Sequence, residues 1–253
     1  MTRIALFGGT GSLGTHVAQQ AITHRFDLSA FVRAPQRLAT DVAGRLHTET
    51  GDLMTAPIDR LAGFIAGHDV LVSCAGVVTE GQRFCDLVER IIVATESLPA
   101  SQRPAVCWFM AGAGLLDIDS SGRRGVDLPK VRGTYWPHRV NFERLQRSGL
   151  GWRLLCPGPM VQGPAIGLER LRVSVDALPE PLPGWTKHLP GALALPFFGS
   201  RIPNMIIPYA DAATFMLAHL DASGPFTRKR VGLALPAGMK GRKDHWAAQA
   251  GRP

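Results

Sequence analysis

The sequence predicts an α/β fold in which a doubly wound parallel sheet carries a small C-terminal substrate lobe. Through residues 1–156, short apolar or β-branched runs alternate with helical stretches. This alternation is typical of a parallel sheet that is covered by helices on both faces. After Cys156 the composition changes, and residues 157–203 are dense in Pro and Gly with bulky apolar residues among them. The change indicates a separate lobe beside the sheet.

Strands alternate with helices along the first half of the chain, apart from two successive strands at residues 28–32 and 46–50. The expected strands are Arg3 to Phe7, Leu28 to Val32, Leu46 to Thr50, Val70 to Cys74, Ala105 to Met110 and Trp152 to Cys156. The expected helices are Leu13 to His24, Ile58 to Ala66, Gln82 to Leu98 and Pro137 to Ser148. Apolar residues at helical spacing make the third helix the clearest. Pro137 favours the first turn of the fourth, and Gly149 ends it.

The rest of the chain divides by composition. Residues 157–203 have no strong periodicity, which is typical of a lid, a binding loop or a small apolar substrate lobe. Regular structure then resumes over residues 204–237, with a strand at Met205 to Pro208, a helix at Ala210 to Leu220 and a strand at Arg230 to Leu235. We expect this part to return to the core. Because residues 204–237 return to the core, the chain is effectively one domain. Residues 238–253 form a basic tail.

Composition excludes several classes of protein. With 253 residues, 45% of them apolar and 19% charged, the chain is globular rather than disordered, collagenous or coiled-coil. No apolar run approaches the ~18 residues of a membrane span, and Met1 to Phe7 lacks the long apolar region of a signal peptide. These features predict a cytoplasmic protein without a membrane partner.

The charge and the cysteines exclude two further kinds of site. The net charge is +8, but the basic residues are scattered and have no aromatic residues interleaved, so we expect a solvated surface and no nucleic-acid partner. Small anionic ligands stay open. Four cysteines show neither a CxxC motif nor a His spacing suited to a metal, which favours buried, reduced thiols and no metal site.

A glycine-rich loop between the first strand and the first helix is the strongest chemical signal. It consists of Gly8, Gly9, Thr10, Gly11, Ser12, Leu13 and Gly14. Glycines permit the tight turn, let backbone N–H groups approach a pyrophosphate, and allow the helix to pack closely on the strand. The N-terminus of the helix adds partial positive charge. The loop therefore predicts a dinucleotide cofactor.

The end of the second strand sorts NAD from NADP. A carboxylate there would accept hydrogen bonds from both ribose hydroxyls, but this chain has Arg33 and, four residues later, Arg37. Guanidinium groups bind a 2′-phosphate through charge-assisted hydrogen bonds. The alternative is two solvated arginines on the surface. We expect NADP(H), with NAD the less favoured cofactor.

Together these motifs resemble an atypical short-chain dehydrogenase/reductase. The features are GGTGSLG at Gly8 to Gly14, the Arg33 ending of the second strand, Gly51-Asp52-Leu53 and Ser73-Cys74-Ala75-Gly76. The subgroup is that of NAD(P)H-binding, NmrA-like and flavin-reductase or biliverdin-reductase-B-like proteins. The resemblance covers residues 3–158 and implies a Rossmann-type fold with NADP bound by residues 1–156. It implies that Asp52 and Leu53 border the adenine and that Ala75 and Gly76 border the ribose and diphosphate. Asp52 could instead cap the turn before the next helix.

The catalytic pattern of related dehydrogenases is incomplete in this chain. They carry a Ser after the fifth strand and a YxxxK pair. This chain has no Ser there but Ala111-Gly112, which we expect to border the cofactor, and Tyr135 is followed at the same spacing by Arg139, whose guanidinium could hold the ribose hydroxyls in place of the Lys. Tyr135 could act as a general acid. A helix that begins at Pro137 would leave Tyr135 outside it and away from Arg139, which favours the alternative, an aromatic lid residue.

Two further positions follow from the resemblance. It implies that His138 lies beside the nicotinamide ribose, although a lone His is otherwise most often structural. It also implies that Pro157-Gly158 forms a turn over the nicotinamide, with Cys156 where Arg is common.

Two functions are consistent with these residues. The first is an NADPH-dependent oxidoreductase that reduces a small apolar acceptor, such as a flavin, a quinone or an aromatic carbonyl, by hydride transfer. The second is a non-catalytic NADP-binding regulator, which the NmrA-like resemblance implies. The missing Ser and Lys favour the regulator, whereas the aromatic residues of the 157–203 lobe favour the enzyme.

Overall fold

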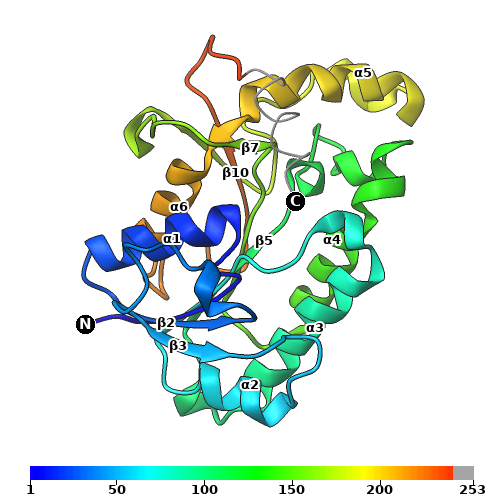
Figure 1. The fold of residues 1–253 in the computed structure, drawn as a ribbon. Coiled ribbons are helices and arrows are strands. Elements are labelled where there is room, and N and C mark those ends of the chain that lie inside the picture. The colour runs from blue at the N-terminus through cyan, green and yellow to red at the C-terminus, as the bar shows by residue number, and fades with distance from the viewer. Residues whose placement is uncertain (242–253) are drawn as a thin grey trace.

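A computed structural model describes residues 1–241 and contains one central sheet between two layers of helices (Figure 1). The strands are Arg3–Phe7 (β1), Asp27–Val32 (β2), His47–Thr50 (β3), Val70–Ser73 (β4), Val106–Met110 (β5), Trp152–Leu155 (β6), Met160–Val161 (β7), Arg172–Val175 (β8), Ile207–Pro208 (β9) and Arg230–Ala234 (β10). The α-helices are Ser12–Thr23 (α1), Ile58–Ile65 (α2), Gln82–Glu96 (α3), Val131–Arg147 (α4), Gly191–Arg201 (α5) and Tyr209–Ala218 (α6).

The sheet has the Rossmann-type strand order expected from the alternation of strands and helices. Its eight strands follow the order β3-β2-β1-β4-β5-β6-β10-β8, and every neighbouring pair is parallel except β10 and β8. The chain starts at β1 and winds outward in one direction to β3, then crosses to β4 on the other side. This reversal brings the ends of β1 and β4 together, which is where ligands of such sheets bind.

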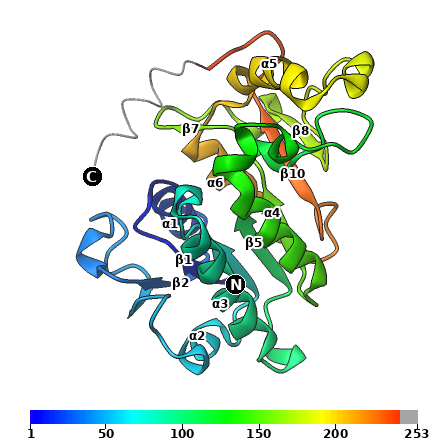
Figure 2. The same cartoon turned by 90° about the vertical axis from the view of Figure 1, so that its right-hand side faces the viewer.

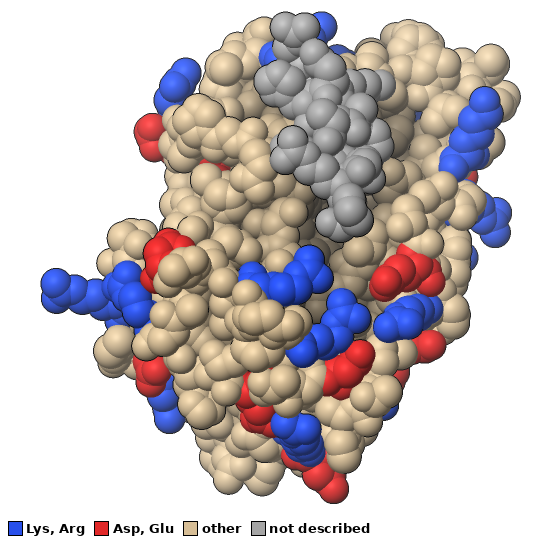
Figure 3. Space-filling view, in the orientation of Figure 1, with Lys and Arg blue, Asp and Glu red and all other residues tan. Residues whose placement is uncertain are grey.

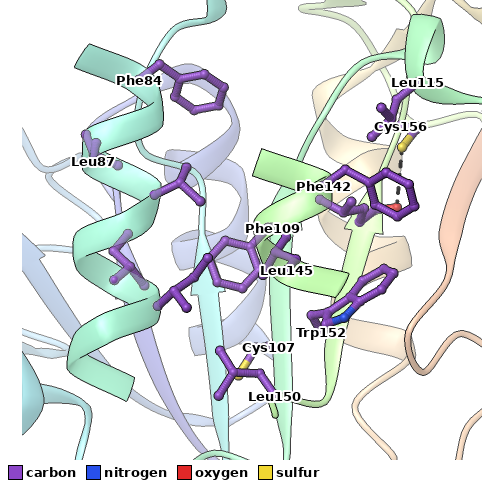
Figure 4. Close-up of a cluster of buried hydrophobic side chains, with 14 of the residues drawn as sticks. Phe84, Leu87, Cys107, Phe109, Leu115, Phe142, Leu145, Leu150, Trp152 and Cys156 are labelled. Carbon is purple, nitrogen blue, oxygen red and sulfur yellow. Dashed lines mark hydrogen bonds between the residues drawn. The ribbon is translucent and has the colours of Figure 1, made fainter. Parts of the chain in front are cut away.

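Side-chain alternation in the strands builds a separate core on each face. In β1, Ala5 and Phe7 pack into the core that α2, α3 and α4 cover, whereas Ile4 and Leu6 pack into the core beneath α1 and α6. Figure 4 shows part of the first core, where Phe142 of α4 meets Trp152 of β6 edge to face at 5.8 Å between ring centroids. The two cores fix the positions of the strand ends.

Residues 157–203, which we call the upper part of the molecule, contain regular structure that the sequence did not predict. Residues 157–203 include the helix α5, the short strand β7 and the strand β8, and β8 joins the main sheet as its antiparallel edge. In Figure 2, α5 lies at the opposite end of the molecule from α2. The expected strand at Met205 to Pro208 is instead a 3-10 turn, Ile202–Met205, followed by the two-residue strand β9.

The fourth expected helix begins six residues earlier than predicted. It starts at Val131 rather than at Pro137, which lies inside the helix. A proline there removes the N–H that would bond the carbonyl group of Gly133, but Gly133 is exposed, so water is available to that carbonyl. The expectation that Tyr135 lies outside the helix was therefore wrong.

Two further findings concern chain segments and cysteines. Within residues 1–241, no helix combines the length and the apolar character that a membrane crossing requires. Cys85, Cys107 and Cys156 are buried and Cys74 is half-buried, and all four are free thiols. Of the basic tail expected at 238–253, residues 242–253 lie outside the described residues.

Candidate functional site

The glycine loop joins β1 to α1 in a conformation that excludes side chains at two positions. Gly8 has φ +79°, and a Cβ atom there would lie 2.7 Å from the backbone nitrogen of Ala75. At Gly14 a Cβ would lie 2.0 Å from the carbonyl oxygen of Gly8. The loop therefore packs on the chain that follows β4, and the first turn of α1 packs on the loop. Gly11 differs, because a Cβ there would meet only the carbonyl oxygen of Gly8, at 3.4 Å.

The N-terminus of α1 lies directly behind this loop and has no polar side chain of its own to cap it. Gly11 is the N-cap residue, no side chain forms a capping hydrogen bond, and the first turn contains no acidic residue. The first N–H groups of a helix lack partners within it and carry partial positive charge. Together with the open space at Gly11, this arrangement suits a phosphate group.

Arg33 and Arg37 lie at the neighbouring strand end, where β2 finishes. A 3-10 turn, Pro35–Arg37, turns the chain back, with the Arg37 N–H donating to the Ala34 carbonyl oxygen at 3.0 Å. Both arginines are exposed, and neither forms an ion pair with any carboxylate in residues 1–241. Two guanidinium groups are therefore available for an anion beside the glycine loop.

Asp52 and Leu53 follow β3, and their side chains have structural contacts. The Asp52 carboxylate accepts a hydrogen bond from the Met54 N–H at 2.8 Å, which closes the turn before α2. The capping role that the sequence left open for Asp52 is therefore present. Leu53 is buried in the core beneath α2 and α3. One oxygen of Asp52 has no protein partner among the described residues, so the carboxylate keeps acceptor capacity.

Ala75 and Gly76 lie after β4, against the glycine loop and against α3. Gly76 has φ +94°, and a Cβ there would lie 2.4 Å from the Phe84 ring. A side chain at this position would therefore both strain the backbone and collide with α3. Phe84, one of the apolar residues at helical spacing in the predicted third helix, therefore packs directly against Gly76.

His138 contacts the segment that follows β5. A Cβ at Gly112 would lie 3.1 Å from the His138 Nε2 atom, so the imidazole covers Gly112. The Phe84 ring meets the imidazole edge to face, with centroids 5.8 Å apart. His138 is only 7% exposed, and burial lowers its pKa to about 4. The side chain is therefore neutral at pH 7, and its Nδ1 atom has no partner among the described residues.

Tyr135 and Arg139 lie on α4 one turn apart, but they have different surroundings. The Tyr135 ring stacks on His138, with centroids 6.2 Å apart and an angle of 20° between the planes, and Tyr135 is 37% exposed. The Arg139 guanidinium pairs with Glu143 at 3.4 Å and with Asp127 at 3.9 Å. Arg139 therefore has carboxylate partners, whereas Tyr135 borders the imidazole.

Pro157 and Gly158 connect the end of β6 to the same region. The Ala113 N–H donates to the Pro157 carbonyl oxygen at 2.7 Å, which ties this turn to the segment after β5. A Cβ at Gly158 would lie 2.7 Å from the Met205 carbonyl oxygen, so this glycine permits close packing of the upper part. Burial raises the pKa of the adjacent Cys156 thiol to about 12, which leaves it protonated and unreactive.

Asp211 is a buried carboxylate whose contacts the sequence did not predict. It is 1% exposed, and its carboxylate accepts hydrogen bonds from the N–H groups of Ile166 and Gly167, both at 2.9 Å or less. These bonds hold the loop that follows β7 against α6. A single acidic residue in an Ala-rich apolar helix was the available signal, because a buried carboxylate requires partners.

Predicted residues at the ends of four parallel strands, β1, β4, β5 and β6, lie in contact with one another or with His138, whereas Arg33 and Arg37 follow β2, and Asp52 and Leu53 follow β3. Gly8 contacts Ala75, Gly112 contacts His138, and Pro157 bonds Ala113. Figure 3 shows this side of the molecule hollowed between the part with α2 and α3 and the part with α5, with Lys and Arg side chains beside the hollow. The guanidinium of Arg139, which was also predicted to belong to the site, forms ion pairs with Asp127 and Glu143.

Comparisons with known proteins agree with this geometry. A family model described as NAD(P)H-binding matches residues 8–178. A Rossmann-fold NAD(P)-binding family protein from Shigella flexneri superimposes with a TM-score of 0.64 at 15% identity, covering 96% of this chain and 98% of that one.

Two further solved structures have the same fold. A short-chain dehydrogenase/reductase from Veillonella parvula gives a TM-score of 0.64 at 15% identity, over 94% of this chain and 96% of that chain. ChuY, an anaerobilin reductase from Escherichia coli, gives 0.63 at 17% identity, over 93% of this chain and 98% of that chain.

Proposed function

Because the chain belongs to the NAD(P)H-binding family, a group of atypical short-chain dehydrogenases/reductases, we propose that it is an NADPH-dependent oxidoreductase. In this proposal a small apolar acceptor, such as a flavin, a quinone or an aromatic carbonyl, receives the hydride. The observation that carries the proposal is the glycine loop with its uncapped helix, together with two exposed arginines at the end of β2 that have no carboxylate partner within residues 1–241.

The residues present fit such a cofactor. The space in front of Gly11 and the first N–H groups of α1 suit the diphosphate, and Arg33 and Arg37 suit the 2′-phosphate. Ala75 and Gly76 would border the ribose on the adenosine side. NADPH is favoured over NADH because β2 is followed by guanidinium groups rather than by a carboxylate.

The bound nicotinamide supplies the hydride, and the protein supplies orientation. In the proposal His138 packs beside the nicotinamide ribose as a neutral imidazole, since its pKa is lowered by burial. A neutral ring offers a hydrogen bond without placing a second positive charge near the reacting ring. The segment after β5 has no Ser that could donate a proton. The proton for the acceptor therefore comes from water or from Tyr135.

The acceptor is expected to lie beneath the upper part of the molecule. Trp185 is 56% exposed, and its ring meets Phe197 edge to face at 5.2 Å between centroids. Exposed aromatic surface of this kind suits a flat apolar acceptor.

A cytoplasmic location is part of the proposal, because the four cysteines are free thiols.

The test is NADPH oxidation, followed by absorbance, with a flavin, a quinone and an aromatic aldehyde as acceptors. The wild type should oxidise NADPH with at least one of them. His138→Ala should slow that reaction or weaken NADPH binding, whereas Arg147→Gln, a change on the exposed last turn of α4, should leave both unchanged. Tight NADPH binding without oxidation by any acceptor would contradict the enzymatic proposal.

One observation favours a second candidate, a non-catalytic NADP-binding regulator. Tyr135 lacks the two partners that assist the tyrosine of related dehydrogenases, because no Ser follows β5 and Arg139 stands in place of the Lys and is paired with Glu143 and Asp127. Such a regulator would bind NADP⁺ and NADPH but would reduce no acceptor. The acceptor screen separates the two candidates.

A further inference from the structure

A cavity lies beside the N-terminal part of α4, on the side of the helix that faces away from His138. Its volume is about 570 Å³, within the range of sites that hold small molecules. The segment before α4 and the first turns of the helix form its walls. Its main lining residues are Val126, Pro129, Lys130, Arg132, Trp136 and Arg139.

All the titratable residues that line this cavity are cations. Lys130 and Arg132 form no ion pair with any residue of the described part of the chain. Arg139 pairs with Glu143 at 3.4 Å and with Asp127 at 3.9 Å, but the guanidinium side chain is 39% exposed, and exposed pairs of this kind are weak. A ligand with one or two negative charges therefore matches the charge of the cavity.

The remaining wall is apolar and includes a flat ring. Helical spacing places Arg132, Trp136 and Arg139 on the same side of α4. Val126 and Pro129 add aliphatic surface on the facing segment. The indole of Trp136 suits stacking of a planar ring, and the neighbouring cations suit the acidic group that the ring carries.

This cavity is separate from the surroundings of His138. Trp136 and His138 are two residues apart, which turns their side chains about 160° from each other around the helix. His138 faces Gly112 and Phe84, whereas Trp136 faces the cavity. We propose that the cavity is a second ligand site, which binds a planar aromatic molecule that carries one or two carboxylates or similar acidic groups. The proposal goes beyond the oxidoreductase function and does not depend on it.

The test uses naphthoate as the probe and naphthalenemethanol as its neutral counterpart. Calorimetric titration of the full chain, with and without saturating NADPH, should give a Kd for naphthoate of about 1 mM or lower in both cases. The neutral compound should bind at least ~10-fold more weakly, because it lacks the charge-assisted contacts. Trp136→Phe should remove the change in tryptophan fluorescence that naphthoate causes.

Substitutions at the cavity locate the site. Lys130→Gln and Arg132→Gln should each weaken naphthoate about 10-fold, with NADPH affinity changed less than about 2-fold. Arg147→Gln is the matched control, since it removes an exposed cation from the same helix outside the cavity, and should leave naphthoate binding unchanged. Thermal melts check that the variants are folded. Absence of binding, equal binding of the neutral compound, competition with NADPH, or an equal loss in Arg147→Gln would each overturn the proposal.

Discussion

Substitution of Gly11 should separate cofactor binding from folding. Gly11 has φ −84° and ψ 168°, an extended conformation that valine adopts readily, and a Cβ there meets only the Gly8 carbonyl oxygen at 3.4 Å. The valine side chain would therefore project into the space in front of α1. A phosphate bound at the first N–H groups of the helix would need the same space.

The magnitudes differ for folding and for binding. Replacing a glycine N-cap by an apolar residue costs about 1 kcal/mol or less of folding free energy. Loss of two charge-assisted hydrogen bonds to phosphate costs about 3 kcal/mol or more, which weakens binding by at least ~100-fold. Gly11→Val should therefore stay folded and lose measurable affinity for NADPH.

Gly14→Ala is the contrasting variant, because its Cβ would lie 2.0 Å from the Gly8 carbonyl oxygen. Backbone atoms must shift to admit it, at a cost of about 1–3 kcal/mol or more. The melting temperature should fall by several degrees, at about 2–4 °C per kcal/mol for a chain of this size.

Circular-dichroism melts and NADPH titration by tryptophan fluorescence compare the two variants. A folded Gly11→Val protein with wild-type NADPH affinity would refute the reasoning, and so would wild-type stability of Gly14→Ala.

Two further predictions concern the residues on α4. With a quinone or flavin acceptor, Tyr135→Phe should change turnover by less than about 3-fold, because water supplies the proton, whereas with an aromatic aldehyde the loss should reach ~100-fold. Steady-state rates with both acceptors check this, and a 100-fold loss with the quinone would contradict it. The pKa of His138 is lowered to about 4, so the unfolded chain binds more protons than the folded chain between pH 4 and 6.5. Stability should accordingly be complete above pH 6.5 and fall by up to about 3 kcal/mol as the pH drops to 4. Urea unfolding at pH 5 and pH 7 measures the difference, which should shrink in His138→Gln; an unchanged difference would show that His138 is not its source.

Much of the fold follows from local pattern. The parallel strands other than β3, which is polar and partly exposed, are short apolar runs that are largely buried, and the predicted bounds of β1 to β6 agree with the observed ones within one residue. The glycine loop is similarly local, because a turn at positive φ and a close helix approach both require glycine in the sequence itself.

The upper part of the molecule escaped prediction for physical reasons. α5 contains Pro196 and has apolar residues on every side, with only Ala194 and Phe198 buried, so its sequence has no amphipathic period. In β8, Val173 and Val175 face solvent while Arg172 and Ser174 are half-buried, which inverts the usual pattern of a strand. Tertiary packing rather than local preference determines these elements.

The candidate site shows the same division. Gly8 to Gly14 and Arg33 stand out in the sequence, because their spacing relative to the first two strands carries the signal. The contact of His138 with Gly112, and the role of Phe84 between Gly76 and His138, join residues far apart in the chain. No local pattern reports such contacts, and a buried apolar stripe predicts only that Phe84 is inside.

The relative affinity for NADPH and NADH tests the central claim most directly. Calorimetric titration of the wild type should show NADPH binding at least ~10-fold more tightly, since one charge-assisted contact to the 2′-phosphate contributes about 1.5 kcal/mol or more. In Arg33→Ala the preference should fall toward unity through loss of NADPH affinity, with NADH affinity unchanged. Equal affinity of the wild type for both cofactors, or an unchanged preference in Arg33→Ala, would contradict the account.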